Sequence, residues 1–252
     1  MQIYFIGAGP GDPELITVKG QRILGEADIV IYAGSLVNPA LLSLVKQGAQ
    51  VYNSASMTLA EVITVMLEGV QNNKMVVRLH TGDPSIYGAI QEQMDELNKH
   101  NIEYKVIPGV SSFLATAAAL KQEYTLPDVS QTVIVTRIEG RTPVPEKESL
   151  ASLASHNATM CIFLSVHMIE EVVTELIKGG YTETTPIAIV QKASWPEEKI
   201  VRGTLGDIAQ KIKENDIMRT AMIVVGQCLN TSYSLSRLYA PEFAHMYRDA
   251  SK

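Results

Sequence analysis

Two glycine-rich segments hold the residue types best suited to binding a small molecule. The first has the sequence Gly-Ala-Gly-Pro-Gly-Asp-Pro at residues 7–13, and the second has Thr-Gly-Asp-Pro at residues 81–84. Each follows an apolar run, at residues 3–6 and 75–79, that is typical of a buried parallel strand. Open α/β folds bind ligands at the carboxyl ends of such strands. The sequence therefore predicts a small-molecule cleft at one edge of a parallel sheet.

The first segment departs from the dinucleotide-binding pattern G-x-G-x-x-G where that pattern meets phosphate. Asp12 stands at the last glycine position, and its carboxylate would repel a pyrophosphate. Pro10 and Pro13 stiffen a stretch that would have to wind into a helix N-terminus with free N–H groups. A nicotinamide cofactor is therefore disfavoured, which leaves a different ligand or a plain tight turn.

The second segment suits close contact between backbone and ligand. Gly82 lets a ligand approach the chain, and Pro84 biases Asp83 towards an extended conformation. Exposed carbonyl oxygens in such a loop favour a cationic ligand over a phosphate. The alternative is an Asx turn that caps the following helix.

A third turn from strand to helix has the sequence Pro-Gly-Val-Ser-Ser at residues 108–112. Ser111 and Ser112 are natural helix caps, and capping is the default interpretation of either residue. In a parallel sheet all three turns lie on one edge, and this common location favours a binding site over three unrelated turns.

Metal and hydrolase chemistry find little support. The five histidines show neither i,i+4 pairing nor a cysteine partner at ligand spacing, and no G-x-S-x-G motif is present. We therefore expect no metal site. His80 directly precedes Thr81, so it either touches a ligand or is an ordinary histidine at a strand end. Leu164 and Ala193 end apolar runs in the second half of the chain, where core packing is the default.

The composition predicts a soluble globular protein rather than a nucleic-acid or membrane protein. The chain has 252 residues, of which 46% are hydrophobic, and its net charge is −6. No window approaches the ~20 apolar residues of a membrane span, and no signal peptide precedes the first strand. Cys161 and Cys228 lie in apolar surroundings, so we expect buried free thiols in a cytoplasmic protein.

Alternating apolar and helical patterns predict an α/β fold of two domains. Residues 1–122 contain five expected strands (3–6, 29–32, 51–53, 75–79, 104–107) and helices near 18–26, 39–45, 59–70, 89–99 and 112–120. Residues 131–230 contain strands at 132–136, 159–164, 187–192, 199–202 and 221–225. A hairpin turn at 195–199 implies that this second sheet is mixed, whereas the first is mostly parallel. We expect the active-site trough between the two domains, and residues 231–252 form a C-terminal tail.

Together, the segments 7–13, 81–84 and 108–112 resemble those of the tetrapyrrole (corrin/porphyrin) methyltransferase family, and the resemblance extends from residue 3 to about residue 230. It implies a homodimeric enzyme that methylates a tetrapyrrole with S-adenosylmethionine. We expect neither a nucleic acid nor a membrane as a partner. The cofactor contacts that the resemblance implies are Pro10, Thr81, Gly82, Asp83, Ile86, Ser111, Ser112, Leu164, Ala193 and Ala221.

The implied chemistry explains why no catalytic triad or metal site is needed. S-adenosylmethionine carries a sulfonium that is already a good leaving group, so the protein has to align donor and acceptor and exclude water. A single general base would suffice to take up a proton, and Asp83 and His80 are the candidates.

Arg137 and Arg141 are the best-placed groups for a substrate with many carboxylates. They lie on a loop stiffened by Pro143 and Pro145, and forked guanidinium groups suit carboxylates. The alternative is a surface loop with solvated charges.

Three further segments, at residues 32–37, 78–83 and 136–145, resemble the branch of the family that methylates carbon C-11 of a cobalamin precursor. Uroporphyrinogen methyltransferases usually carry Asp and Gly where this chain has Ala33 and Thr81. A sister tetrapyrrole C-methyltransferase, such as a uroporphyrinogen-III methyltransferase, is the first alternative. A metabolite-binding sensor without catalysis is the second.

Overall fold

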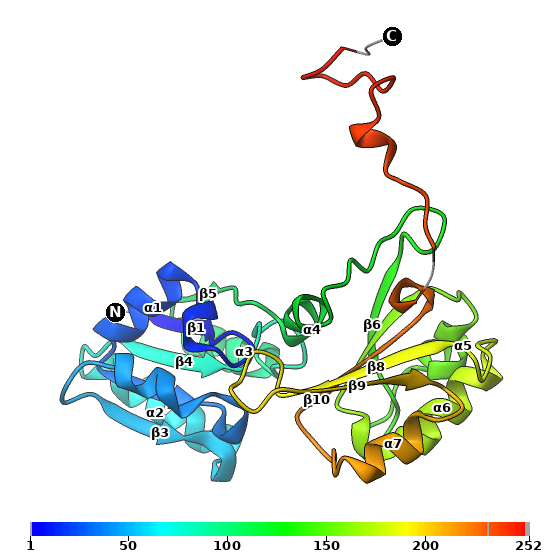
Figure 1. Ribbon diagram of the computed structural model, residues 1–252. Coiled ribbons are helices and arrows are strands. Elements are labelled where there is room, and N and C mark those ends of the chain that lie inside the picture. Colours follow the sequence, from blue (N-terminus) through cyan, green and yellow to red (C-terminus); the bar gives the residue numbers. More distant parts are fainter. Residues whose placement is uncertain (1, 231, 250–252) are drawn as a thin grey trace. The chain divides into compact units, whose positions relative to one another are not determined.

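The computed structural model describes residues 2–230 and 232–249, which form two compact units (Figure 1). The first unit comprises Met1–Ala119 together with Lys192–Lys199, and the second comprises Leu120–Gln191 together with Ile200–Lys252. The division expected from the sequence was 1–122, 131–230 and a separate tail, whereas residues 120–122 and the described residues of the tail belong to the second unit. Residues 192–199 lie between two strands of the second unit but pack with the first.

The first unit contains an all-parallel sheet of five strands in the order β3-β2-β4-β1-β5. All five expected strands are present, and the central strands β4 and β1 pair from Ile3 opposite Val76 to Gly7 opposite His80. The strands are β1 (Ile3–Gly7), β2 (Ile29–Tyr32), β3 (Gln50–Asn53), β4 (Val76–His80) and β5 (Tyr104–Ile107).

Three α-helices connect these strands, α1 (Val18–Glu26), α2 (Leu59–Gln71) and α3 (Gln91–Lys99), and a fourth, α4 (Ser112–Leu120), follows β5. Helix α2 begins with a capping box, in which Glu61 Oε2 accepts from the Thr58 N–H at 2.7 Å and Thr58 Oγ1 accepts from the Glu61 N–H at 3.3 Å. The helix expected near 39–45 is instead the 3₁₀ helix Pro39–Leu44, capped by Asn38. A short connector of this kind closes its turns with i,i+3 bonds.

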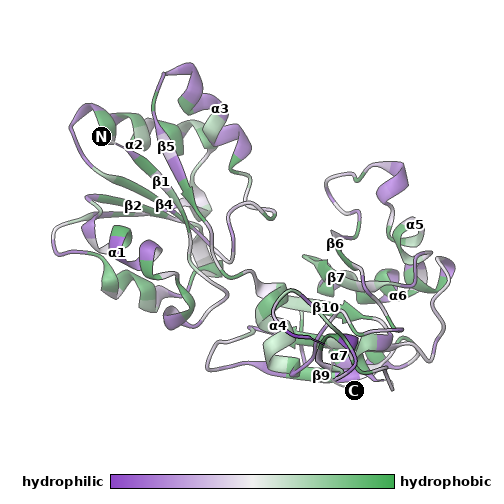
Figure 2. Cartoon of the chain, turned by 90° about the horizontal axis from the view of Figure 1, so that it is seen from above, coloured by the Kyte–Doolittle hydropathy of each residue, from purple (hydrophilic) through white to green (hydrophobic). Residues whose placement is uncertain are grey.

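The inner strands β1, β2 and β4 are buried on both faces, as is usual in parallel sheets, whereas the edge strands β3 and β5 are largely exposed. Successive residues of a strand alternate between two cores: Ile6, Leu79 and Leu24 belong to one, and Phe5 and Met66 belong to the other. Figure 2 shows the same pattern, with hydrophobic strands β1 and β4 beside helices whose polar residues lie away from the sheet.

The second unit contains the expected mixed sheet, in the order β6-β7-β10-β8-β9. Strands β6 and β7 are parallel, whereas β10 runs antiparallel to both β7 and β8. The strands are β6 (Val133–Arg137), β7 (Thr159–Phe163), β8 (Pro186–Gln191), β9 (Lys199–Thr204) and β10 (Ala221–Val225), and the helices are α5 (Leu150–Ala154), α6 (Ile169–Lys178) and α7 (Ile208–Glu214).

One core joins these three helices to the second sheet, with Met160, Ile162 and Ile223 from strands packed against Val172 and Leu176 of α6. The remaining short helices are all 3₁₀ segments: Pro13–Leu15, Gly34–Leu36, Ser54–Ser56, Glu146–Glu148, Val166–Met168, Gln227–Leu229 and Arg237–Tyr239.

Both cysteines are free and buried, which confirms the prediction for these thiols. Burial raises the pKa of Cys161 to about 12 and also raises the pKa of Cys228. Thiols held in their neutral form are poor nucleophiles, so neither cysteine is suited to catalysis.

Candidate active site

Three glycines bring the turns after β1, β4 and β5 into direct contact. A Cβ atom on Gly109 would lie 2.2 Å from the carbonyl oxygen of Gly82, and one on Gly7 would lie 2.5 Å from the Cα atom of Gly109. No other residue fits at either position without moving backbone atoms. The predicted convergence of the three turns on one edge of the sheet is therefore confirmed.

Two of these turns are also joined by backbone hydrogen bonds. The N–H of Gly82 donates to the carbonyl of Gly9 at 2.8 Å, and the N–H of Gly9 donates to the carbonyl of Gly82 at 3.3 Å. Both glycines have positive φ values, +78° for Gly9 and +60° for Gly82. Glycine adopts this left-handed conformation without steric cost, so the sequence and the backbone agree here.

Asp83 uses both carboxylate oxygens to hold backbone N–H groups. Its Oδ2 accepts from the Gly109 N–H at 2.9 Å, and its Oδ1 accepts from the Ser85 N–H at 2.8 Å. The second bond forms an Asx turn, which was the alternative interpretation of this segment from its sequence. Thr81 also anchors the segment, because its Oγ1 donates to the carbonyl of Leu36 at 2.7 Å. These contacts give Asp83 and Thr81 a role in positioning the turn.

Ser111 and Ser112 lie beside Gly82. A Cβ atom on Gly82 would meet the Cα atom of Ser111 at 3.5 Å and the nitrogen of Ser112 at 3.7 Å, which are ordinary van der Waals distances. Helix α4 begins here, because the carbonyl of Ser111 accepts from the N–H groups of Leu114 and Ala115. Ser111 and Ser112 of the expected contacts therefore lie next to Gly82.

His80 lies in the core rather than on this edge. Its side chain is only 3% exposed, and its ring centroid lies 6.2 Å from that of Phe5. Desolvation, with a smaller effect from the charge of Arg78, lowers the pKa of His80 to about 3. Nε2 has no hydrogen-bond partner among the described residues. A neutral, enclosed imidazole of this kind is a weak base, which disfavours His80 as the proton acceptor.

Arg78 is buried near His80 and is held by internal contacts. Its Nε donates to the side-chain oxygen of Gln93 at 3.2 Å, and its Nη1 donates to the carbonyl of Ile31 at 3.1 Å. Burial lowers the pKa of Arg78 to about 10, which leaves the guanidinium charged. Arg78 therefore links β4 to β2 and α3, and its positive charge is buried in the first unit.

In the first unit, Ala193 lies on the 192–199 segment that packs against the glycine-rich turn. The amide of Asn38, the hydroxyl of Ser194 and the indole of Trp195 all bond to backbone groups of residues 10–12. Sequence reasoning missed these three residues because they lie far from the turn along the chain. A lone tryptophan in a proline-containing turn was the one available signal.

In the second unit, Arg137 and Arg141 differ in their contacts. The guanidinium of Arg137 donates to the carbonyls of Ile138, Thr142 and Pro143, at 3.1, 3.1 and 2.8 Å. These hydrogen bonds of Arg137 stabilise the conformation of the loop that follows β6. Arg141 is exposed, and within residues 2–230 and 232–249 it makes neither a hydrogen bond nor an ion pair. Arg141 is thus the arginine of this loop that is free to meet an anionic ligand.

Unusual backbone conformations accompany the expected cofactor contacts in both units. Leu164 has φ +55° and is 59% exposed, and Thr220, which precedes Ala221, has φ +53° although it is β-branched. Such conformations cost energy in ordinary residues and concentrate at functional sites. Apart from Asn and Asp, the described residues with positive φ other than glycine are Tyr87, Ala89, Lys121, Leu164, Lys192, Ser194 and Thr220.

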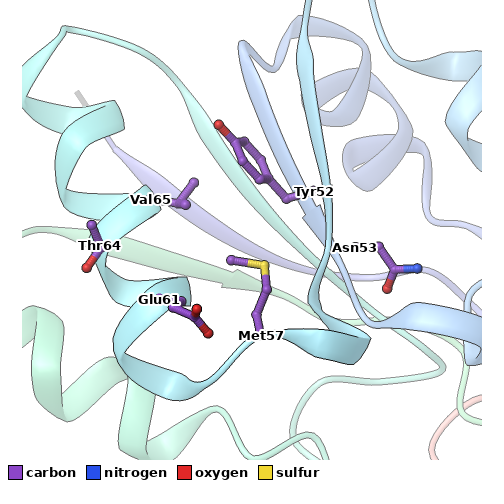
Figure 3. A pocket seen from close by; sticks show the side chains of 6 residues that line it. All are labelled: Tyr52, Asn53, Met57, Glu61, Thr64 and Val65. Atoms are coloured by element: carbon purple, nitrogen blue, oxygen red, sulfur yellow. The ribbon is translucent and has the colours of Figure 1, made fainter.

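An open pocket of the first unit lies elsewhere, beside β3 and α2 (Figure 3). It has a volume of about 430 Å³ and is lined by Tyr52, Asn53, Met57, Glu61, Thr64 and Val65. Its one carboxylate, on Glu61, already serves the capping box of α2. This pocket contains none of the expected site residues. Across residues 2–230 and 232–249, no group of three or more His, Cys, Asp or Glu side chains is arranged to hold a metal ion.

The fold is that of an α/β protein in which three glycine-rich turns meet at one edge of a parallel sheet. The sequence profile of the tetrapyrrole (corrin/porphyrin) methylases matches residues 2–209, and the chain belongs to this family. No described helix is both long and apolar enough to cross a membrane.

Individual relatives cover nearly the whole chain. The cobalt-precorrin-4 C(11)-methyltransferase of Methanocaldococcus jannaschii is 60% identical over 100% of this chain and 97% of its own length. The X-ray structure of the cobalamin biosynthetic enzyme cobalt precorrin-4 methyltransferase, CbiF, matches with a TM-score of 0.89 and 50% identity over 91% of this chain and 96% of that one. Uroporphyrin-III C-methyltransferase from Thermus thermophilus, in complex with S-adenosyl homocysteine, matches with a TM-score of 0.76 and 27% identity over 91% and 94% of the two chains.

Proposed function

We propose that this protein transfers a methyl group from S-adenosylmethionine to carbon C-11 of precorrin-4 or cobalt-precorrin-4 in cobalamin biosynthesis. The observation that carries the proposal is the meeting of Gly7, Gly82 and Gly109 on one edge of the parallel sheet, in a chain of the tetrapyrrole methylase family. Relatives that methylate C-11 are more similar to the chain than the uroporphyrin-III enzyme is, at 60% against 27% identity. This difference favours C-11 over the sister reaction.

The residues present fit S-adenosylmethionine. The backbone of Gly82 lies against the neutral groups of Ser111 and Ser112, with no side chain of its own between them. Carbonyl oxygens and the Asp83 carboxylate suit a sulfonium cation better than a phosphate. We assign Pro10, Thr81, Gly82, Asp83, Ile86, Ser111 and Ser112 to the part of the cofactor site in the first unit. Ala193 completes this set, and Leu164 and Ala221 are its counterparts in the second unit.

When bound, S-adenosylmethionine supplies an activated methyl group that needs no protein nucleophile. The role of this chain is to hold that methyl group and the substrate carbon in line, and turns fixed by glycine contacts are rigid enough to do so. Asp83 stabilises this arrangement through Gly109 and Ser85. Asp83 remains our candidate to take up the proton released at C-11. His80 is disfavoured because it is buried and its own pKa is lowered to about 3.

Substrate binding is proposed for the loop that follows β6. Precorrins carry many carboxylates, and the protein has a net charge of −6, so local positive charge has to outweigh the overall repulsion. Arg141 is exposed and unengaged, whereas Arg137 shapes the loop by binding three of its carbonyls. We therefore assign substrate contact to Arg141 and support of that contact to Arg137.

Mass spectrometry of the methylated product tests the reaction. Purified protein is incubated with methyl-labelled S-adenosylmethionine and, separately, with precorrin-4, cobalt-precorrin-4 and uroporphyrinogen-III. The proposal predicts one new methyl group at C-11 of a precorrin-4 substrate and none on uroporphyrinogen-III. Methylation of uroporphyrinogen-III alone would establish the sister enzyme, and cofactor binding without any methylated product would establish a sensor. Comparison of the two precorrin-4 substrates decides whether the enzyme requires cobalt.

Two further properties are part of the proposal. The family resemblance supports a homodimer, and light scattering of the eluted protein should give about twice the chain mass of 27.5 kDa. A cytoplasmic location is supported by the two buried free thiols, since reducing compartments keep cysteines unpaired. Localisation of a tagged chain in its native cell tests this second point.

A further inference from the structure

A hydrogen bond across 185 positions of sequence links the loop between β8 and β9 to the glycine-rich turn. The indole Nε1–H of Trp195 donates to the carbonyl oxygen of Pro10 at 3.0 Å. Both residues belong to the first unit, because Lys192–Lys199 packs there. The contact is partly buried, and the indole N–H, which can only donate, finds its acceptor in this carbonyl.

The ring of Trp195 also explains why residue 11 is glycine. A Cβ atom on Gly11 would lie 1.9 Å from Cδ1 and 2.1 Å from Nε1 of the indole. The φ value of Gly11 is not in the left-handed region, so its backbone conformation alone would accept another residue. Contact with Trp195 is therefore what excludes a side chain at position 11.

Two more contacts hold the same turn. The N–H of Asp12 donates to Ser194 Oγ at 3.0 Å, and the side-chain amide of Asn38 donates to the carbonyl of Gly11 at 2.8 Å. Residues 10–12 are thus fixed from both sides by groups distant in sequence. The conformation of the turn depends on these tertiary contacts as well as on its glycines and prolines.

The loop that carries Trp195 is itself ordered. The N–H of Trp195 donates to the carbonyl of Lys192 at 2.9 Å, and the N–H of Ser194 donates to Glu198 Oε2 at 2.7 Å. Lys192 Nζ lies 5.4 Å from the centroid of the indole and 3.5 Å from Glu197 Oε2. These contacts hold the indole in place before any ligand arrives.

We propose that Trp195 is a positioning residue that fixes Pro10 and Ala193 together for cofactor binding. The inference rests on the proposed function, in which both residues contact S-adenosylmethionine. Trp195 bonds directly to Pro10, and Ala193 lies between Lys192 and Ser194, whose φ values of +50° and +70° give the loop its shape. Trp195 acts through these neighbours and takes no part in methyl transfer.

The test measures binding of S-adenosylhomocysteine by titration calorimetry. Trp195→Phe keeps the ring but loses the N–H, and should weaken binding about fivefold, the effect of losing one neutral hydrogen bond. The KM for S-adenosylmethionine should rise by a similar factor, while kcat at saturating cofactor stays unchanged. Lys199→Gln, at an exposed position at the end of the same segment, serves as the control and should leave the affinity unchanged.

A double-mutant cycle separates positioning from general damage. Gly11→Ala alone should weaken binding by about tenfold or more, because the new methyl group displaces the indole. In a Trp195→Ala background the same Gly11→Ala change should cost no more than about twofold. Trp195 is the sole tryptophan, so its emission in the wild-type protein should also change when S-adenosylhomocysteine binds.

Three results would overturn the inference: wild-type affinity in folded Trp195→Phe and Trp195→Ala proteins, an equal cost of Gly11→Ala in both backgrounds, or a fall in kcat with KM unchanged. Failure of the wild-type protein to bind S-adenosylhomocysteine at all would instead refute the proposed function. The two failures are therefore distinguishable.

Discussion

The carboxylate of Asp83 joins the turn after β4 to the turn after β5, because its Oδ2 accepts a hydrogen bond from the backbone N–H of Gly109 at 2.9 Å. Its other oxygen accepts from Ser85 and closes its own turn. Hydrogen bonds to a charged acceptor are stronger than neutral ones, so a single side chain sets the spacing of two turns. Asp83, the candidate general base, thus also stabilises the contact between the two turns.

Replacement of Asp83 should separate these two roles. Asp83→Ala leaves two N–H groups without a partner and should lower the free energy of unfolding by about 2 kcal/mol in urea titrations. Asp83→Asn keeps one acceptor oxygen, so its free energy of unfolding should lie between those of the wild-type protein and Asp83→Ala. If Asp83 only positions the turn, weaker S-adenosylhomocysteine binding should accompany the loss of stability. Normal cofactor binding in Asp83→Asn, with a greatly reduced kcat, would instead identify Asp83 as the base.

Gly82→Val should abolish cofactor binding while the protein remains folded. A β-branched residue at φ +60° is strained by about 1–2 kcal/mol, and its side chain would occupy the space beside Ser111. Gly48 offers a matched control, because its φ is +83° and no atom lies within 4 Å of the position of its Cβ. Gly48→Val should therefore lose similar stability but keep the wild-type affinity for S-adenosylhomocysteine. Equal affinities in the two variants would remove the turn at residues 81–84 from the site.

Arg141→Ala should weaken tetrapyrrole binding without affecting the cofactor. Loss of one charge-assisted contact costs about 1.5–3 kcal/mol, which corresponds to about a tenfold to hundredfold weaker affinity. The salt dependence of binding should also decrease, because a screened attraction has been removed. Arg22→Ala, on the exposed face of α1, removes an equal charge and should change neither affinity. Unchanged tetrapyrrole affinity in Arg141→Ala would contradict this role.

Arg137→Ala should act through the shape of the loop. The three carbonyls of residues 138, 142 and 143 lose their donor, so the loop should become more accessible to proteases. Tetrapyrrole affinity should fall as well, since the ordering of the loop would then oppose binding. Limited proteolysis with and without the tetrapyrrole measures both effects. An unchanged cleavage rate would show that these bonds contribute little to loop order.

His80 should make the protein less stable in acid. Its pKa is about 3 in the folded chain against an ordinary value of 6.5, so between these values the unfolded chain binds a proton that the folded chain excludes. The contribution of neutral His80 to the free energy of unfolding is therefore fully present above about pH 6.5 and is lost as the pH decreases towards 3. At pH 5 the loss should be about 2 kcal/mol relative to pH 7.

The variant His80→Phe removes this titration and should reduce the difference in unfolding free energy between pH 7 and pH 5 by about that amount. Urea unfolding at the two pH values measures it. His156→Gln, at an exposed position, serves as the control and should leave the difference as in the wild-type protein. An unaltered pH dependence in His80→Phe would show that other groups govern acid stability.

Local features of the sequence indicated most of the secondary structure and the meeting of the three glycine-rich turns. Apolar runs of strand length, separated by helical patterns, are enough to indicate buried parallel strands, and the Thr58–Glu61 capping box marks the start of α2 from its spacing alone. The glycines of the three turns show where the backbone had to approach other groups. Their partners were not visible, but the order of strands and helices placed all three on one edge.

Only the tertiary structure decided how individual side chains are used. His80 precedes the site in sequence yet is buried beside Phe5, and Arg137 is bound by the carbonyls of its own loop. Trp195 meets Pro10 across 185 positions, so no local pattern could predict that contact. Local patterns report the energies of neighbours along the chain, whereas burial, charge pairing and the fit of a ring against Gly11 depend on residues that only folding brings together.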